Sequence, residues 1–144
     1  MTKATQVTAA LRERLAEISR GNGYLTDLQR VYDPFERVPD KAPLPYVLVR
    51  YPLDSRTSNA SYQATRVRTF EIECVFGKSA EPGALDDLHV DLLRCLGFGQ
   101  DQPERVFPGL IEDQDEAEFL PASEGKNTHS LILTIGVTYV ETYN

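Results

Sequence analysis

The fold of this chain is decided by the stretch THSLILTIGVTYV, residues 128–140. Its apolar side chains recur at every second position, namely Leu131, Leu133, Ile135, Val137 and Tyr139. The positions between them hold Ser130, Ile132, Thr134, Gly136 and Thr138. A period of two is typical of a strand with one buried face. The stretch is about a dozen residues long, against a usual five or six, so it predicts a strand that spans a sheet from edge to edge.

Other stretches predict further strands beside it. Residues 64–76 alternate in the same way, with one face formed by Phe70, Ile72, Cys74 and Phe76. Gly77 ends this second long strand. The short apolar run PYVLVRY, residues 45–51, is closed by Pro52 and predicts a buried strand. Residues 117–120 predict a short strand, and residues 24–32 are at most partly extended.

Two stretches have the spacing of helices. In residues 3–20 the apolar side chains Ala4, Val7, Leu11, Leu15 and Ile18 recur at steps of three and four. Thr2 or Thr5 is expected to cap this helix, and Gly21 and Gly23 to stop it. In the second helix Ser79 is the expected cap and Pro82 lies in the first turn. Its buried stripe is Leu85, Leu88, Leu92 and Leu96, and Gly97 closes it.

The connections are polar or rich in proline. Residues 33–45 predict a surface loop, and residues 121–127 a turn. Residues 53–63 read as a polar loop that is disordered or becomes ordered only against a partner. Residues 98–115 read as an irregular crossing. The order of elements predicts one domain over residues 1–144, an α+β fold with a mostly antiparallel sheet of four to five strands and two helices packed on one face.

The composition of the chain argues against several classes of function. Lys and Arg number 15 against 22 Asp and Glu, a net charge of −7, which argues against a protein whose main task is to grip nucleic acid. The longest apolar runs are only a few residues, so no membrane span is expected. Residues 1–20 are polar and lack the apolar segment of a signal peptide, so folding in a cytoplasm is expected. In that reducing setting Cys74 and Cys95 are expected to be buried thiols.

Few residues are candidates for catalysis or for binding a metal or phosphate. Asp86 and His89 share a helix face at a spacing that a divalent ion can bridge, but the opposite leucine face must be buried, which favours a solvated helix face. His129 has no catalytic partner at a motif spacing, and an ordinary strand-end histidine is the favoured interpretation. Gly97-Phe98-Gly99 follows a helix and lacks the context of a phosphate loop. No catalytic, cofactor or metal residue is therefore assigned, and no enzyme is expected.

Charge is distributed in two blocks of opposite sign. Between Gly99 and Glu118 only Arg105 opposes seven acids, namely Asp101, Glu104, Glu112, Asp113, Asp115, Glu116 and Glu118. This block is either a solubilising loop or a negative surface that faces a partner or channel. Between residues 50 and 68 the only acid is Asp54, against Arg50, Arg56, Arg66 and Arg68. Opposite blocks on one small domain suit a head-to-tail contact between copies, which closes into a ring where the rotation permits.

The order of these elements resembles the tail terminator proteins of long-tailed bacteriophages, also called tail completion or minor tail proteins. The resemblance is carried by VTAALRERL at residues 7–15, PYVLV at residues 45–49, TFEIECVF at residues 69–76 before the leucine helix, and LILTIGVTY at residues 131–139. It covers essentially the whole chain and rests on pattern and length.

The resemblance implies a structural role in the virion. Members of the family are α+β domains that form a hexameric ring on the tail tube, end its polymerisation and provide the surface that joins tail to head. The implied partners are the tail tube protein and a head-tail connector or neck protein, with DNA passing through without specific binding. The implied location is the tail or neck of a virion, assembled in the host cytoplasm. Two alternatives stay open: another neck or head-completion protein, or a small ligand-binding domain or enzyme.

Seven residues are candidates for contacts within such an assembly. They come from the basic block, the acidic block and the face of the closing strand opposite the core: Arg56, Arg66, Arg68, Asp113, Asp115, Thr134 and Thr138. The small side chains around Gly136 suit the close approach of a neighbouring subunit.

Overall fold

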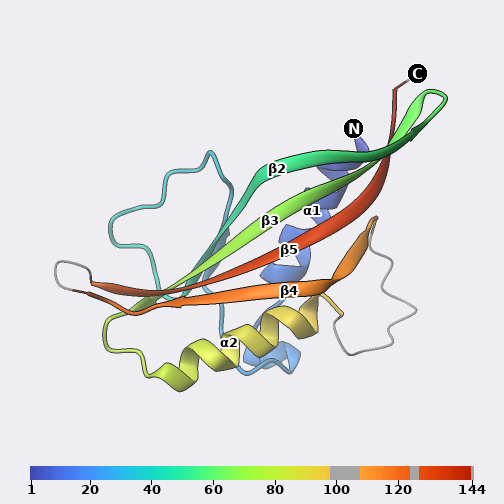
Figure 1. Ribbon diagram of the computed structural model, residues 1–144. Coiled ribbons are helices and arrows are strands. Elements are labelled where there is room, and N and C mark those ends of the chain that lie inside the picture. The colour runs from blue at the N-terminus through green and yellow to red at the C-terminus, as the bar shows by residue number, and fades with distance from the viewer. Residues whose placement is uncertain (98–107, 124–126, 144) are drawn as a thin grey trace.

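The computed structural model describes residues 1–97, 108–123 and 127–143, with the backbone alone at residues 112–114 (Figure 1). Its elements follow in the order α1 (Lys3–Ala16), a 3-10 turn (Arg20–Asn22), β1 (Arg30–Tyr32), β2 (Tyr46–Ala60), β3 (Gln63–Gly77), α2 (Pro82–Cys95), β4 (Leu110–Leu120) and β5 (Thr128–Thr142). Strands dominate, and three of them are 15 residues long.

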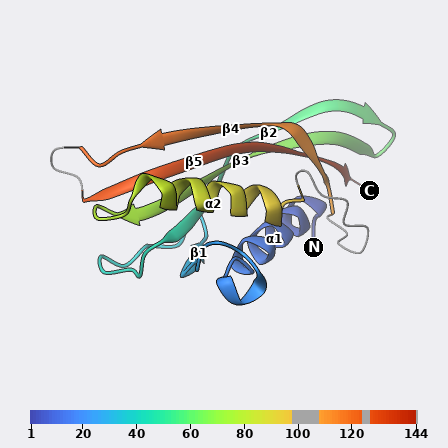
Figure 2. The same ribbon diagram turned by 90° about the horizontal axis from the view of Figure 1, so that it is seen from below.

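The strands form one sheet in the order β1-β2-β3-β5-β4. β1 pairs with β2 in parallel over three residues, and every other pair is antiparallel. Figure 2 shows both helices on the same side of the sheet. The predicted α+β class, with a mostly antiparallel sheet and helices on one face, is confirmed.

The closing strand forms the centre of the core. β5 lies between β3 and β4, and its predicted buried positions are covered by the two helices. The largest fully buried side chains in contact there include Leu11, Leu15, Leu88, Leu92, Leu131 and Leu133. These residues join α1, α2 and β5 in one cluster, as the alternation predicts. Burial of this apolar surface is the main favourable contribution to folding.

The first helix is shorter than its apolar pattern predicts. Thr2 caps it, accepting a hydrogen bond from the Thr5 backbone N–H at 3.1 Å. The helix ends at Ala16, not at residue 20, and Ile18 stays in the core from the following turn. The last apolar residue of the predicted helix, Ile18, therefore reaches the core from a turn and not from the helix. Gly23 has a φ of 89°, the left-handed conformation that glycine adopts without strain.

The start of the second helix also differs from prediction. Glu81, not Ser79, is the N-cap residue, and no side chain bonds the first turn. Pro82 occupies the first turn, where its missing N–H leaves no helical hydrogen bond unmade. The leucine stripe is buried as predicted, and Gly97 closes the helix with a φ of 90°.

The prediction of a loop at residues 53–63 is wrong. β2 continues to Ala60, turns at Ser61 and Tyr62, and pairs with β3 from Gln63. Pro52 does not end the strand because it lies at a register shift between Arg50 and Leu53, beyond the part of β2 that pairs with β1. Proline is tolerated at bulges and sheet edges, where its missing N–H breaks no ladder bond. The polar side chains are tolerated because residues 55–63 are all exposed.

The irregular segment expected at residues 98–115 ends earlier than predicted. β4 begins at Leu110, where an irregular segment was expected to continue to Asp115, and the short strand expected at residues 117–120 is its last third. Pairing with β5 sets this length, with a register shift between Ile111 and Asp115. Acidic residues have low strand propensity, which concealed the strand in the sequence. Residues 98–107 lie outside the described part.

Both cysteines are buried and unbridged, as expected. Burial raises the pKa of the Cys74 thiol, and the nearby carboxylate of Glu73 adds to the effect. The Cys95 thiol donates to the Leu92 carbonyl oxygen at 3.2 Å. Both behave as small apolar core residues.

Candidate interaction surfaces

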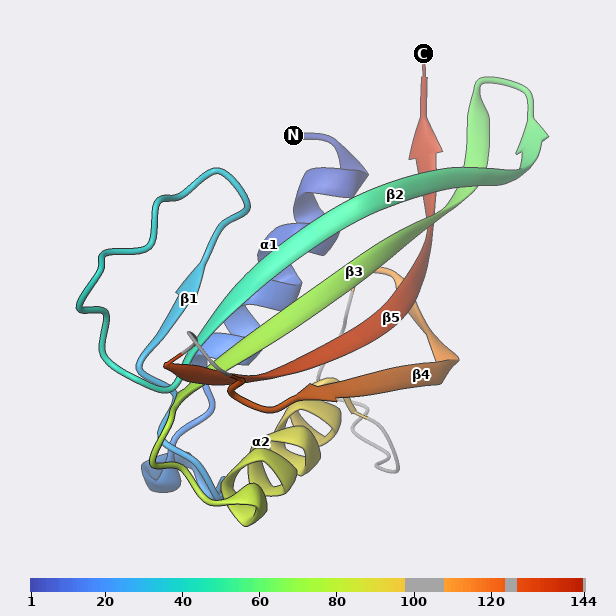
Figure 3. The same cartoon turned by 60° about the vertical axis from the view of Figure 1, so that its left-hand side comes forward.

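The β2–β3 hairpin projects beyond the helices as an arm, defined here as residues 53–68 (Figures 1 and 3). Every residue from Ser55 to Gln63 is exposed. Tyr62 lies at its tip with a φ of 63° and 73% of its surface exposed. The tip is tied to the end of the chain by the Tyr143 backbone N–H, which donates to the Tyr62 carbonyl oxygen at 2.7 Å. β5 pairs with β3 along the whole arm, from Gln63 with Thr142 to Thr69 with Gly136, so the arm is an exposed three-stranded extension of the sheet with β2 as its outer edge.

A polar cluster fixes the base of the arm. Asp54 accepts hydrogen bonds from Arg66 Nε at 2.5 Å, from Arg68 Nε at 2.9 Å and from the Tyr139 hydroxyl. Arg68 also donates to the Thr8 hydroxyl of α1 at 3.1 Å. The cluster thereby joins β2, β3, β5 and the first helix.

The cluster is held together by charge. Burial disfavours ionisation of Asp54, but the hydrogen bonds from Tyr139, Arg66 and Arg68 outweigh it, so the pKa of this carboxyl lies below its ordinary value. Burial, followed by the hydrogen bond to Asp54, raises the pKa of Tyr139 to about 12. The hydrogen bond to Asp54 is also the first cause that raises the pKa of Arg66. At neutral pH the cluster is therefore one carboxylate between two guanidinium groups and a neutral phenol.

The arginines of the basic block have different roles. Arg66 and Arg68 are brought together on Asp54, and Arg50 pairs with Glu73 at 2.6 Å. Arg56 is exposed on the arm and forms no ion pair within the described part of the chain. Three of the four arginines thus have an ion-pair partner inside the molecule, although Arg66 and Arg68 share one carboxylate.

The sheet has two edges that no other described strand covers completely. β1 covers β2 only from Tyr46 to Leu48, so the arm side of β2 has no neighbouring strand among the described residues. β4 forms the opposite edge. On it Asp115, Glu116 and Glu118 are all exposed. The side chain of Asp113 lies outside the described residues. Open edges present unpaired backbone N–H and C=O groups to any strand of suitable chemistry.

The face of the sheet opposite the helices carries no described helix (Figure 2). Thr134 lies there between Glu71 of β3 and Glu116 of β4. Thr138 lies between Val67 and Leu110. Both threonines are partly exposed, whereas Gly136 between them is buried. This face is therefore a mixed polar and apolar surface with acidic groups.

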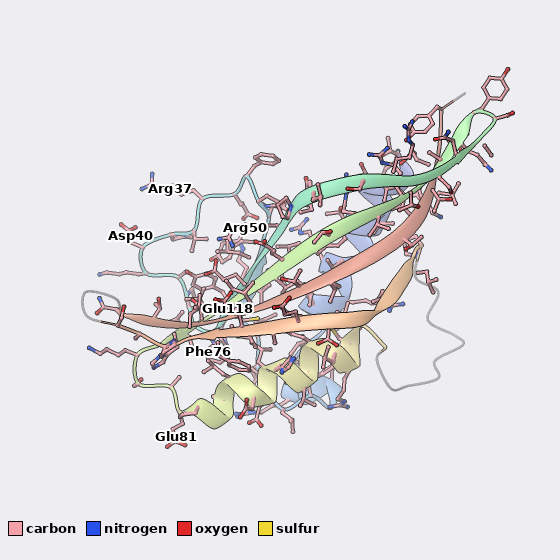
Figure 4. All side chains as sticks on the ribbon, viewed as in Figure 1. Arg37, Asp40, Arg50, Phe76, Glu81 and Glu118 are labelled. Carbon is pink, nitrogen blue, oxygen red and sulfur yellow. The ribbon has the colours of Figure 1, made fainter. Side chains whose placement is uncertain are left out.

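An apolar cavity lies at the end of the sheet away from the arm tip. Its volume is about 540 Å³, and it is lined by Ala80, Pro82, Leu85, Asp86, Phe119, Pro121 and His129. Figure 4 marks this end by Phe76 at the end of β3 and Glu81 at the start of α2. His129 bridges two segments here, since its Nδ1 accepts from the Ala122 N–H at 2.7 Å and its Nε2 lies 3.1 Å from the Lys78 carbonyl oxygen. Its position matches the strand-end histidine expected from the sequence.

Asp86 and His89 of α2, considered above as possible metal ligands, lie in different surroundings. Asp86 and Asp87 are exposed, but His89 is partly buried and packs edge-on against Phe119, with ring centroids 5.9 Å apart. Asp91, farther along the same helix, is fully buried, and its carboxylate accepts the Leu25 backbone N–H at 3.0 Å. Among the described residues no group of three or more His, Cys, Asp or Glu side chains is placed to hold a metal ion.

Sequence reasoning missed Asp54 and Tyr139 as members of the cluster. A signal for it was present, since Arg66 and Arg68 continue the alternation of Phe70 and Ile72 toward the start of β3. Arginines on the buried face of a strand require partners of opposite charge. The partners come from other strands, so only the pairing register identifies them.

Comparison with known proteins adds no assignment: no protein-family model matches the sequence, and no curated protein does. Within the described residues no helix is long and apolar enough to cross a membrane.

Proposed function

We propose that this chain is a structural protein that ends a phage tail tube. Copies form a ring of six that stops tube polymerisation and joins tail to head, in the virion tail or neck. The proposal starts from the resemblance in element order and length. The observation that carries it is the arm, in which residues 55–63 are all exposed and which extends beyond both described helices. Such an exposed strand edge is suited to assembly.

Two further features support an assembly role. Among the described residues neither the arm side of β2 nor the outer side of β4 has a neighbouring strand, and no described helix covers the sheet face opposite α1 and α2. That face carries Glu71, Glu116 and Glu118. If it lines the ring, its acids would repel the DNA phosphates and let DNA pass without being held. No catalytic task is assigned to any residue under this proposal.

The deciding experiment is deletion of the gene in its phage, followed by electron microscopy of the products. We expect tails of uncontrolled length that do not join heads, and restoration of normal particles by the gene supplied in trans. Tails of normal length that still join heads would refute the proposal. Normal tails with unattached heads would instead favour the alternative of a neck or head-completion protein. The mass of the purified protein is a supporting test, because six copies of the 16.2 kDa chain give about 97 kDa.

The apolar cavity at the start of α2 favours a second candidate, a small ligand-binding domain. Its lining is apolar, with Asp86 and His129 as the polar groups, which is the usual composition of a ligand site. Filling the cavity by Ala80→Phe separates the two functions. If tail assembly is the function, the variant should still complement the deletion; loss of complementation by a folded Ala80→Phe protein would favour the ligand-binding candidate.

A further inference from the structure

We propose that the β2 edge of the arm in one copy pairs with the β4 edge of a second copy, continuing the sheet from subunit to subunit. The inference deepens the proposed function, on which it rests, by naming the contact that closes the ring. It commits to a second copy of this chain as the occupant of both edges. The contact is head-to-tail, because the two edges are different surfaces of one molecule.

The strand directions permit this pairing. β2 is antiparallel to β3, β3 to β5, and β5 to β4, so β2 and β4 run in opposite directions within one copy. When a second copy is placed beside the first in the same orientation, its β2 therefore runs antiparallel to the first copy's β4. Antiparallel pairing needs no change in the sheet's own hydrogen-bond pattern.

The positions of the two open edges set the tilt of the strands in the ring. The regular part of β4, Asp115–Leu120, lies level with Ile135–Ser130 of β5. The arm edge, Leu53–Ala60, is paired through β3 to a level near Gly136–Thr142. The two edges are thus displaced along the strands by about six residues, or about 20 Å.

This displacement fits a closed sheet. Four strands, β2, β3, β5 and β4, separate one contact from the next, which is a width of about 19 Å at the usual strand spacing. A 20 Å displacement over 19 Å tilts the strands by about 45° from the ring axis, near the 35–45° of closed sheets.

The charges of the two edges are complementary. The arm holds Arg56, Arg66 and Arg68 against Asp54, and Arg56 is exposed. The described side chains of β4 include three exposed acids, Asp115, Glu116 and Glu118, and no base. Of these, Asp115 lies on the same face of the sheet as Arg56. Opposite charges attract across such an edge, whereas arm-to-arm or β4-to-β4 pairing brings like charges together. The charge pattern therefore favours the head-to-tail pairing over either symmetric one.

Cysteine cross-linking tests the contact directly. Phage carrying both Arg56→Cys and Asp115→Cys is grown, because these two side chains lie on the same face of the sheet, and its purified tails are oxidised and run on a non-reducing gel. The native Cys74 and Cys95 are fully buried, so they do not compete. We expect a ladder of covalent oligomers of this chain that ends at the ring. The matched control replaces Arg56→Cys by Phe35→Cys, which lies in a loop with 93% of Phe35 exposed.

The outcomes separate the contact from the function. A ladder no stronger than in the Phe35→Cys control, or a product that joins Arg56→Cys to the tube or neck protein, overturns the pairing even if gene deletion supports the terminator role. A ladder in particles whose tail length does not depend on the gene supports the pairing and refutes the terminator role.

Charge exchange gives a second, independent measurement. Arg56→Glu and Asp115→Arg should each lower plaque titre by at least tenfold, because each places like charges across the contact. The double exchange restores opposite charges and should recover most of that loss. Circular dichroism of each purified variant checks that these exposed substitutions leave the monomer folded. Single exchanges without effect, or a double exchange as impaired as the sum of the singles, would refute the pairing.

Discussion

Replacing Asp54 by asparagine should destabilise the chain far more than loss of an ordinary surface ion pair. The substitution keeps the side chain's size but removes the charge that faces Arg66, Arg68 and the Tyr139 hydroxyl. Only 18% of the Asp54 side chain and 17% of the Arg68 side chain are exposed. A hydrogen bond to a charged group contributes about 1.5–3 kcal/mol, and a half-satisfied cation that is mostly buried adds to the loss.

We expect Asp54→Asn to lower the free energy of unfolding by about 2–3 kcal/mol, because the asparagine retains part of the hydrogen bonding. In urea this corresponds to a shift of the midpoint by about 1 M at a typical slope for a domain of this size. The matched control is Glu36→Gln, which breaks the exposed pair between Arg30 and Glu36 at 2.6 Å and should cost less than 1 kcal/mol. Equal losses in the two variants would show that the cluster is an ordinary surface network.

The pH dependence gives the same prediction a second readout. The pKa of Asp54 is lowered in the folded protein, so the charged form is stabilised by folding. Its contribution is present above the ordinary aspartate pKa of about 4 and is lost as the pH falls through the lower folded value. The stability gap between wild type and Asp54→Asn should therefore be constant near neutrality and close in acid. A gap that stays open at pH 2 would refute the electrostatic explanation.

Three further predictions concern the same fold. Tyr139→Phe should lower the free energy of unfolding by about 1 kcal/mol at neutral pH. Because folding raises the pKa of Tyr139 to about 12, the wild type should lose this stability between about pH 10 and 12, and the variant should lose less over that range in urea unfolding. Gly109→Ala should destabilise, since a Cβ there would lie 2.7 Å from the nearest atom of Val137, while Gly83→Ala meets open space and should be neutral or stabilising; thermal unfolding of the pair measures both. Glu141→Gln should cost about 1 kcal/mol in urea unfolding, because the Glu141 carboxylate accepts the first backbone N–H groups of α1 at 2.9 and 3.1 Å, and a loss indistinguishable from zero would contradict this capping role.

The parts of the fold that the sequence predicted are those with one buried face. β5 and the body of β3 alternate cleanly, and α2 carries an unbroken leucine stripe. In each of these elements the side chains that recur with the local period are the buried ones, so the sequence pattern is sufficient to predict the element. The arm and the first half of β4 lack such a face. Their residues are polar on both sides, and only the neighbouring strand holds them extended.

The candidate interaction surfaces were likewise predictable only in part from the sequence. The opposite charges of the two blocks are visible in the printed sequence, and both blocks contain exposed residues that stay candidates for contacts. The sequence did not indicate that Arg66 and Arg68 are committed to Asp54, or that Arg56 is left exposed, because these relations depend on the register between β2 and β3. Thr134 and Thr138 likewise became members of an open face only once both helices were placed on the other side.

The stretch from Thr128 to Val140 determined by itself that this chain builds a long strand with one buried face, because side-chain alternation is a local property of the backbone. The sequence likewise determined two amphipathic helices and the α+β class, since apolar surface must be buried somewhere. Tertiary structure decided which strands lie beside β5, how far the arm overhangs, and which edges stay open. Those features arise from pairing between residues far apart in the chain, and hydrogen bonds between strands leave no period in either strand's own sequence.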